Sequence, residues 1–238
     1  MKLLLPKQHG AWAMFIIPFI LGIDAGGFSF LHIPLFIGWL SLYLATYPIL
    51  MYVKGKKKEY YFKWSSIYLG FALVFLVFVL IFKWQMLLFG LAMVPFFFIN
   101  IYFAKKKKER AFVNDVIAIC VFCIGGIASF YLGTGYFNNE AFFIALLSFL
   151  FFLGSTFYVK TMIREKKNRR FHYYSWCYHL LLIVGIFLLV EEKQIILAYI
   201  PSTIRAFLLV GRKLTIMQVG ILEIINSVIF LFVLLLVF

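Results

Sequence analysis

The chain has 238 residues, of which 65% are hydrophobic and only 13% are charged. A typical soluble domain is about 45–50% apolar and about 25% charged, so this composition excludes a water-soluble globular fold. It predicts a polytopic membrane protein. The net charge of +14 is confined to short clusters between apolar segments, which indicates membrane topology and no nucleic-acid partner.

Apolar segments long enough to cross a membrane recur along the whole chain. A hydrocarbon core about 30 Å thick needs roughly 20 apolar residues per helix. We therefore predict an all-α fold, a polytopic bundle of about nine transmembrane helices that forms a single integral membrane domain over residues 1–238. The predicted spans are residues 9–24, 33–53, 65–82, 85–103, 114–132, 141–159, 174–190, 194–211 and 217–238.

The Lys and Arg residues are distributed unequally between the two sets of loops. Most of the 23 fall on one side, in clusters such as Lys54–Lys63, Lys105–Arg110 and Lys160–Arg170, whereas the other side has Lys83 and Lys193. The positive-inside rule places the basic side, with the N-terminus, in the cytoplasm. An odd number of spans then leaves the C-terminus outside. We expect a multi-pass protein of the cell membrane, with membrane lipid as a partner.

Ionisable residues also occur inside the predicted spans. Each costs about 2.5–3.5 kcal/mol on insertion scales, so such a residue usually has a partner or a function. Arg205 and Glu223 lie at similar depth from the basic side, which favours an ion pair between them. The pair either has a structural role, as a buried ion pair that connects two helices, or a functional role in a cytoplasm-facing cavity. The sequence leaves both interpretations open.

More polar residues lie where spans reach the basic side, and successive antiparallel helices bring these ends together. Lys160 and Arg164 are four residues apart, so they share a helix face and can both bind one phosphate group. We predict a ligand site at this edge, with Asp115 and Glu223 as catalytic acid or base and with no protein metal ligand assigned. The predicted substrate-binding residues are His9, Asn114, Tyr158, Lys160, Arg164 and Arg205.

Three segments carry a resemblance to a known family. They are Lys7 to Met14 followed by Pro18, the pair Asn114-Asp115, and Tyr158 to Glu165. On these residues the chain resembles the YwiC-like family of bacterial membrane proteins over essentially its whole length. This resemblance implies no settled biochemical function.

More distantly, the chain is similar to UbiA-type intramembrane prenyltransferases, in its nine spans, its Lys-x-x-Gly-x-Trp opening at Lys7 and the in-helix Pro18. The resemblance implies a UbiA-like helix arrangement and transfer to a prenyl or quinone-like substrate. It also implies Mg²⁺ held by carboxylate-rich loops after spans two and six. This chain departs from that pattern. Lys54–Glu59 has no paired aspartates, and Glu165 is the one carboxylate of the second loop, so the resemblance leaves Mg²⁺ as an open question.

Three functions therefore stay open. The first is a transferase acting on a lipid-soluble substrate from a cytoplasm-facing cavity. The second is a non-catalytic lipid or quinone binder, or an assembly partner of a membrane complex, which the missing aspartates favour. The third is a small-molecule transporter, which the lack of a detectable inverted repeat disfavours. In each case the ligand is expected to be amphiphilic or phosphorylated.

Overall fold

The computed structural model describes residue 4 and residues 9–238 of the chain. Within these residues the chain forms nine α-helices and one short 3₁₀ helix, Lys193–Ile195. The α-helices are α1 (His9–Gly26), α2 (His32–Val53), α3 (Lys58–Phe82), α4 (Met86–Lys105), α5 (Phe112–Thr134), α6 (Asn139–Ile163), α7 (Arg169–Leu189), α8 (Ile196–Leu208) and α9 (Ile216–Val237). The expected all-α fold is confirmed.

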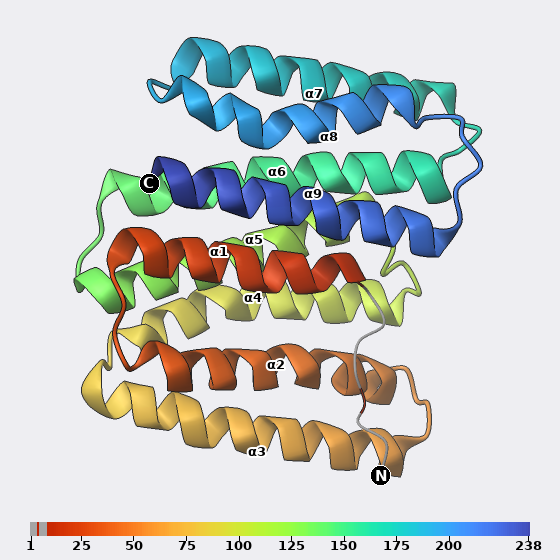
Figure 1. Ribbon diagram of the computed structural model, residues 1–238. Coiled ribbons are helices and arrows are strands. Elements are labelled where there is room, and N and C mark those ends of the chain that lie inside the picture. Colours follow the sequence, from red (N-terminus) through yellow and green to blue (C-terminus); the bar gives the residue numbers. More distant parts are fainter. Residues whose placement is uncertain (1–3, 5–8) are drawn as a thin grey trace.

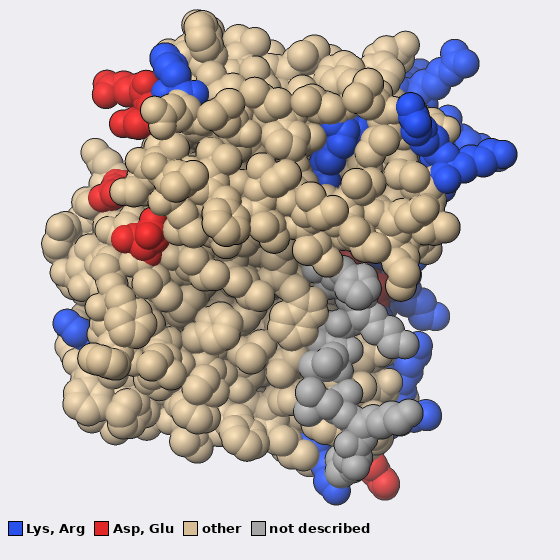
Figure 2. All heavy atoms as spheres, in the orientation of Figure 1, with Lys and Arg blue, Asp and Glu red and all other residues tan. Residues whose placement is uncertain are grey.

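The helices run back and forth across one slab, so that consecutive turns alternate between its two ends (Figure 1). One end carries the turns α2–α3, α4–α5, α6–α7 and α8–α9, and the other end carries the remaining turns with the C-terminus. Lys and Arg side chains gather at the first end, while Asp and Glu side chains are visible at the other (Figure 2). The charge asymmetry predicted from the loops is therefore a property of the folded molecule.

Seven of the described helices are long and apolar enough to cross a membrane, which makes the chain a multi-pass membrane protein. The other two are shorter, with 18 residues in α1 and 13 in α8. At 1.5 Å per residue, α8 is about 20 Å long, so it does not span a hydrocarbon core by itself. The sequence predicted a span over residues 194–211, but the helix ends at Leu208, ahead of Gly211 with its φ of +85°.

The N-terminal helix α1 lies inside the bundle, where it packs against α5, α6 and α9. Its closest approach is to α5 and depends on small residues. A Cβ atom at Gly22 would lie 2.3 Å from the carbonyl oxygen of Gly126 and 2.9 Å from the Cβ of Ser129. The Ser129 hydroxyl also donates a 2.9 Å hydrogen bond to the carbonyl of Phe19. Small residues that let backbones approach are a common basis of helix association in membranes.

Side-chain caps are present at the N-terminal ends of α6, α7 and α9. The Oδ1 atoms of Asn138 and Asn168 accept hydrogen bonds from backbone amides in the first turns of α6 and α7. Thr215 and Gln218 form a capping box at the start of α9. These contacts satisfy amides that a helix N-terminus otherwise leaves unpaired. They mark where α6, α7 and α9 begin.

Candidate functional site

The last four helices turn polar faces toward one another and apolar faces outward. In α8 the buried residues are Ala198, Tyr199, Ser202, Arg205 and Ala206, which share one helical face. In α9 the buried face includes Glu223, Asn226 and Ser227. This inward polarity is typical of a membrane bundle, because the lipid accepts apolar side chains and the polar groups need protein partners.

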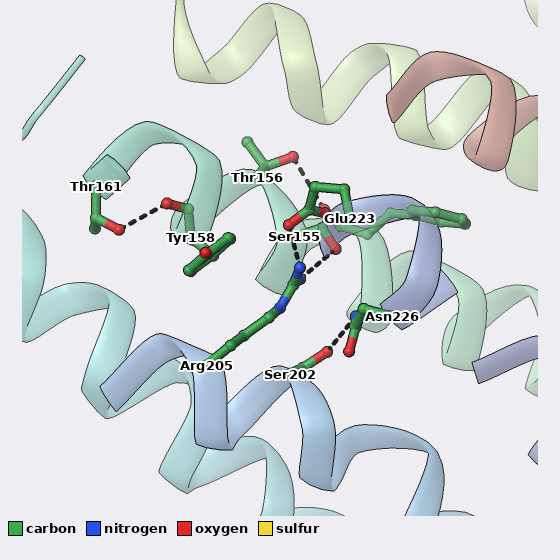
Figure 3. Close-up of polar contacts among 9 residues, drawn as sticks. Ser155, Thr156, Tyr158, Thr161, Ser202, Arg205, Glu223 and Asn226 are labelled. Atoms are coloured by element: carbon green, nitrogen blue, oxygen red, sulfur yellow. Dashed lines mark hydrogen bonds and ion pairs between the residues drawn. The ribbon is translucent and has the colours of Figure 1, made fainter. Parts of the chain in front are cut away.

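Helical spacing brings seven of these polar side chains into one region, which we call the α6–α9 cluster. Its members are Ser155, Tyr158, His179, Ser202, Arg205, Glu223 and Asn226, and all are at least nine-tenths buried. Figure 3 shows six of them, with Arg205 reaching from α8 to α6 and α9. The cluster thus joins three helices through one guanidinium group.

The centre of the cluster is an ion pair between Arg205 and Glu223, which is the pair predicted from their depth. Nη1 of Arg205 donates to Oε1 of Glu223, and Nη2 donates a 3.1 Å hydrogen bond to the hydroxyl of Ser155. The guanidinium carbon lies 4.3 Å from the centroid of the Tyr158 ring. The side chains of the ion pair are 7% and 8% exposed. An ion pair this buried is costly to separate, because either charge alone would be left desolvated.

Several polar atoms of the α6–α9 cluster have no hydrogen-bond partner among the described residues. They are the hydroxyl of Tyr158, Nε of Arg205, Nε2 of His179 and Oδ1 of Asn226. Burying a polar group without a partner costs roughly 2–7 kcal/mol. A stable protein therefore supplies partners for such atoms, from a ligand or from ordered water.

A second group of predicted site residues lies at the basic end, and we call it the α5–α6 edge cluster. Nζ of Lys160 lies 2.8 Å from Oδ2 of Asp115 and donates a 2.8 Å hydrogen bond to the carbonyl of Arg110. Arg164 donates a 3.2 Å hydrogen bond to the same carbonyl. Asn114 donates from Nδ2 to the carbonyl of Glu109 at 2.8 Å. These bonds hold the α4–α5 turn against the end of α6.

The edge cluster is more open to water than the α6–α9 cluster. Lys160 is buried, but the side chain of Asp115 is 33% exposed and Arg164 lies at the surface. Partial burial lowers the pKa of the Arg164 guanidinium, Arg110 adds to this effect, and Asp115 opposes it. An arginine side chain stays protonated at neutral pH in any case. The edge cluster therefore keeps its positive charge.

The structure divides the predicted ligand site into these two clusters. Tyr158, Arg205 and Glu223 come together in one, and Asn114, Asp115, Lys160 and Arg164 in the other. Within the described residues, no hydrogen bond or ion pair joins the two clusters. His9 begins α1, but its side chain lies outside the part of the chain that the structure describes. A cavity of about 120 Å³, lined by Trp39, Leu76, Met86 and other apolar residues of α1 to α5, includes none of the predicted site residues.

The predicted site residues did not include Ser155, Ser202 and Asn226, nor His179, although the sequence places His179 at a depth similar to that of Arg205 and Glu223. A usable signal existed, because Ser202 and Arg205 are three residues apart, as are Glu223 and Asn226, so each pair shares a helical face. The sequence signal at His179 is weaker, because a single histidine on an apolar helix fits a buried packing position as well as it fits a ligand site. Its burial and its place beside Gly154 are visible only in three dimensions.

The carboxylates do not gather into a magnesium site. Among residue 4 and residues 9–238, no group of three or more His, Cys, Asp or Glu side chains is positioned to hold a metal ion. Asp115 and Glu223 each lie against a cationic side chain instead. Because Mg²⁺ is held by carboxylates together with substrate phosphates, the donor set expected from the prenyltransferase resemblance does not fit this ion.

The fold and the clusters define a class: a multi-pass helical membrane protein with a polar interior in its last four helices. The chain belongs to the YwiC-like family, whose model, described as "YwiC-like protein", matches residues 5–130. The "Uncharacterized protein YwiC" of Bacillus subtilis is 48% identical over 232 residues, which cover 97% of this chain and 96% of that protein. An "Uncharacterized protein" of Haemophilus influenzae is 44% identical over 237 residues, covering 100% and 99%.

No solved structure matches the chain. The UbiA-like helix arrangement therefore stays a prediction.

Proposed function

We propose that this protein binds a lipid-soluble molecule inside the membrane, with the polar head group of that molecule held by the α6–α9 cluster. The observation that carries the proposal is the set of buried, unpartnered polar atoms around the Arg205–Glu223 ion pair. They come from four different helices, so no single helix irregularity accounts for them. A head group placed among them would supply the missing hydrogen bonds.

Binding fits the geometry better than the prenyltransferase alternative does. Transfer from a prenyl diphosphate needs cations, usually Mg²⁺, to neutralise the leaving group. The carboxylates proposed as acid or base, Asp115 and Glu223, are each held by a cationic side chain. Each of these carboxylates therefore already has a cationic partner within the protein. We therefore assign Glu223 to holding Arg205 in place and Asp115 to holding Lys160.

We further propose that the basic end of the bundle faces the cytoplasm of a bacterial cell. The support is the gathering of Lys and Arg at that end in the folded chain (Figure 2). Single cysteines at Lys166 and Tyr136, in a background with alanine at the three native cysteines, test it. A membrane-impermeant maleimide should label Tyr136→Cys in intact cells and Lys166→Cys only in inverted vesicles. The reverse pattern would overturn this orientation.

The binding proposal is tested by extracting the purified full-length protein and measuring the extract by mass spectrometry. We expect one compound at near-stoichiometric amount, enriched over bulk lipid. Tyr158→Phe removes an unpartnered hydroxyl but keeps the ring beside Arg205, so it should lower the retained compound about tenfold, the effect of one lost hydrogen bond. With the compound removed from both proteins, the melting temperature of the variant should not fall below that of the wild type.

Tyr199→Phe is the matched control, because the Tyr199 hydroxyl already donates a 2.8 Å hydrogen bond to the carbonyl of Leu147. This variant should lose stability and keep the compound. If the wild-type protein carries nothing above bulk lipid, or if Tyr158→Phe retains as much as the wild type, the binding proposal is wrong.

A further inference from the structure

The charges of the α6–α9 cluster sum to zero, and this constrains the head group. Arg205 and Glu223 carry one charge each and are paired with one another. Ser155, Tyr158 and Asn226 are neutral side chains. An anionic phosphate at the unpartnered Nε of Arg205 would bring a second negative charge next to Glu223, and one buried negative charge would then lack a counter-ion, at a cost of several kcal/mol. The cluster therefore suits a neutral head group.

His179 determines which kind of neutral group fits. Its Nδ1 atom lies 2.7 Å from the backbone carbonyl oxygen of Ser175. A carbonyl oxygen only accepts hydrogen bonds, so Nδ1 carries the hydrogen. In the neutral ring the other nitrogen, Nε2, is then a bare acceptor. A neutral ring is the expected form here, because His179 is fully buried and a charged ring would be costly to remove from water.

The Nε2 atom faces a position where α6 has no side chain. A Cβ atom at Gly154 would lie 3.2 Å from Nε2, tighter than an ordinary carbon contact. Cε1 of Tyr178 would lie equally close to that Cβ atom, so the acceptor is bordered by bare α6 backbone and by the Tyr178 ring. Asn226 contributes a second acceptor, since its amide nitrogen donates a 2.9 Å hydrogen bond to Ser202 and leaves Oδ1 without a partner among the described residues.

Two buried acceptors need hydrogen-bond donors, which a ligand bound in this cluster would supply. We infer, on the basis of the proposed binding function, that the head group is neutral and carries at least one hydroxyl, which donates to Nε2 of His179. Nε of Arg205 and the hydroxyl of Tyr158 are left to bind an oxygen of the same head group. Two sources supply this chemistry in a membrane: a quinol, and a neutral lipid alcohol such as a diacylglycerol.

The test uses the full-length protein in nanodiscs and compares matched pairs of ligands by calorimetric titration. One pair is a short-chain quinol and the corresponding quinone, and the other is a short-chain diacylglycerol and its methyl ether. A phosphate monoester of the same diacylglycerol is the anionic probe. We expect the hydroxylated member of one pair to bind about tenfold more tightly than its partner. This is the gain in affinity that one hydrogen bond to a buried acceptor provides. The pair that shows the preference identifies the source.

Two variants connect the preference to His179. His179→Phe keeps a ring of similar size without the acceptor, and it should bring the two members of the pair to equal affinity. Gly154→Ala crowds the acceptor while leaving its chemistry intact, so it should reduce the preference even if the His179 variant does not fold.

The outcomes separate the two proposals. If no probe binds, the binding function itself fails and the head-group inference fails with it. If the quinone or the methyl ether binds as well as its hydroxylated partner, or if the phosphate binds best, the binding function stands and the hydroxyl inference is wrong. A preference that persists unchanged in both variants also overturns the assignment to His179.

Discussion

The strongest prediction concerns the separation of the buried charges of Arg205 and Glu223. Glu223→Met removes the carboxylate and leaves the guanidinium of Arg205 with only the hydroxyl of Ser155 as a polar partner among the described residues. Removing one member of a buried ion pair costs about 3–5 kcal/mol, whereas replacing both members with apolar side chains is often neutral or stabilising. The double variant Arg205→Met/Glu223→Met should therefore be more stable than Glu223→Met alone.

The expected magnitude is large enough to measure by thermal unfolding. For a chain of 238 residues, 1 kcal/mol corresponds to about 2–4 °C in melting temperature, so Glu223→Met should lower it by roughly 10 °C. The double variant should recover most of that loss. Unfolding can be followed with a thiol-reactive dye, because Cys123 is 7% exposed and reacts only as the bundle opens. Cys120 is partly exposed and Cys177 is exposed, so both are replaced by alanine in every protein compared.

A control at the edge cluster calibrates the result. The side chain of Asp115 is 33% exposed, Lys160 keeps its hydrogen bond to the carbonyl of Arg110, and asparagine retains an acceptor oxygen, so Asp115→Asn should cost about 1 kcal/mol and shift the melting temperature by only a few degrees. The reasoning is refuted if the single variant Glu223→Met is as stable as the double variant. That outcome would mean that Arg205 without its carboxylate is hydrated, and that the α6–α9 cluster is open to water.

Three further predictions test other parts of the fold, two by melting temperature and one by hydrogen–deuterium exchange. Gly22→Ala places a methyl group 2.3 Å from a carbonyl oxygen of α5 and should cost about 1–3 kcal/mol. Gly70→Ala, which meets no atom within 4 Å among the described residues, should be neutral or stabilising, and equal losses in the two variants would contradict the close packing of α1 on α5. His32→Ala removes a 2.8 Å hydrogen bond from Nε2 to a carbonyl oxygen of α5 and should cost about 1–2 kcal/mol, so an unchanged melting temperature would argue against this contact. Lys160→Met breaks its hydrogen bond to the α4–α5 turn, so backbone amides of residues 106–111 should exchange faster with deuterium while those of α9 keep their rates.

The general fold could be predicted because hydropathy decides it. Segments that bury apolar side chains in lipid and satisfy their backbone internally have to be helices, and lysine and arginine mark the end that stays outside the lipid core. The Arg205–Glu223 pair was predictable for a related reason. A positive and a negative side chain at equal depth in a bundle each need a partner of opposite charge, and Arg205 and Glu223 supply it to one another.

The sequence misjudged features that depend on which helices touch. It predicted one ligand site at the basic edge, but α6 presents Tyr158 toward α8 and Lys160 toward the α4–α5 turn, so the polar residues separate into two clusters. It also predicted a full-length span where α8 has 13 residues. Hydropathy averages over all faces of a helix, so it does not indicate which neighbouring helix each face contacts.

The sequence by itself determined the class of the molecule, its helices and its basic end, because these follow from how each segment interacts with water and lipid. The tertiary structure alone decided that α1 lies inside the bundle against α5, and that His179 meets Gly154 in the α6–α9 cluster. The physical reason is that lipid is as apolar as the helices, so burial gives no preference among partners. Close fit between small residues and hydrogen bonds between polar ones make that choice, and both exist only after the helices are assembled.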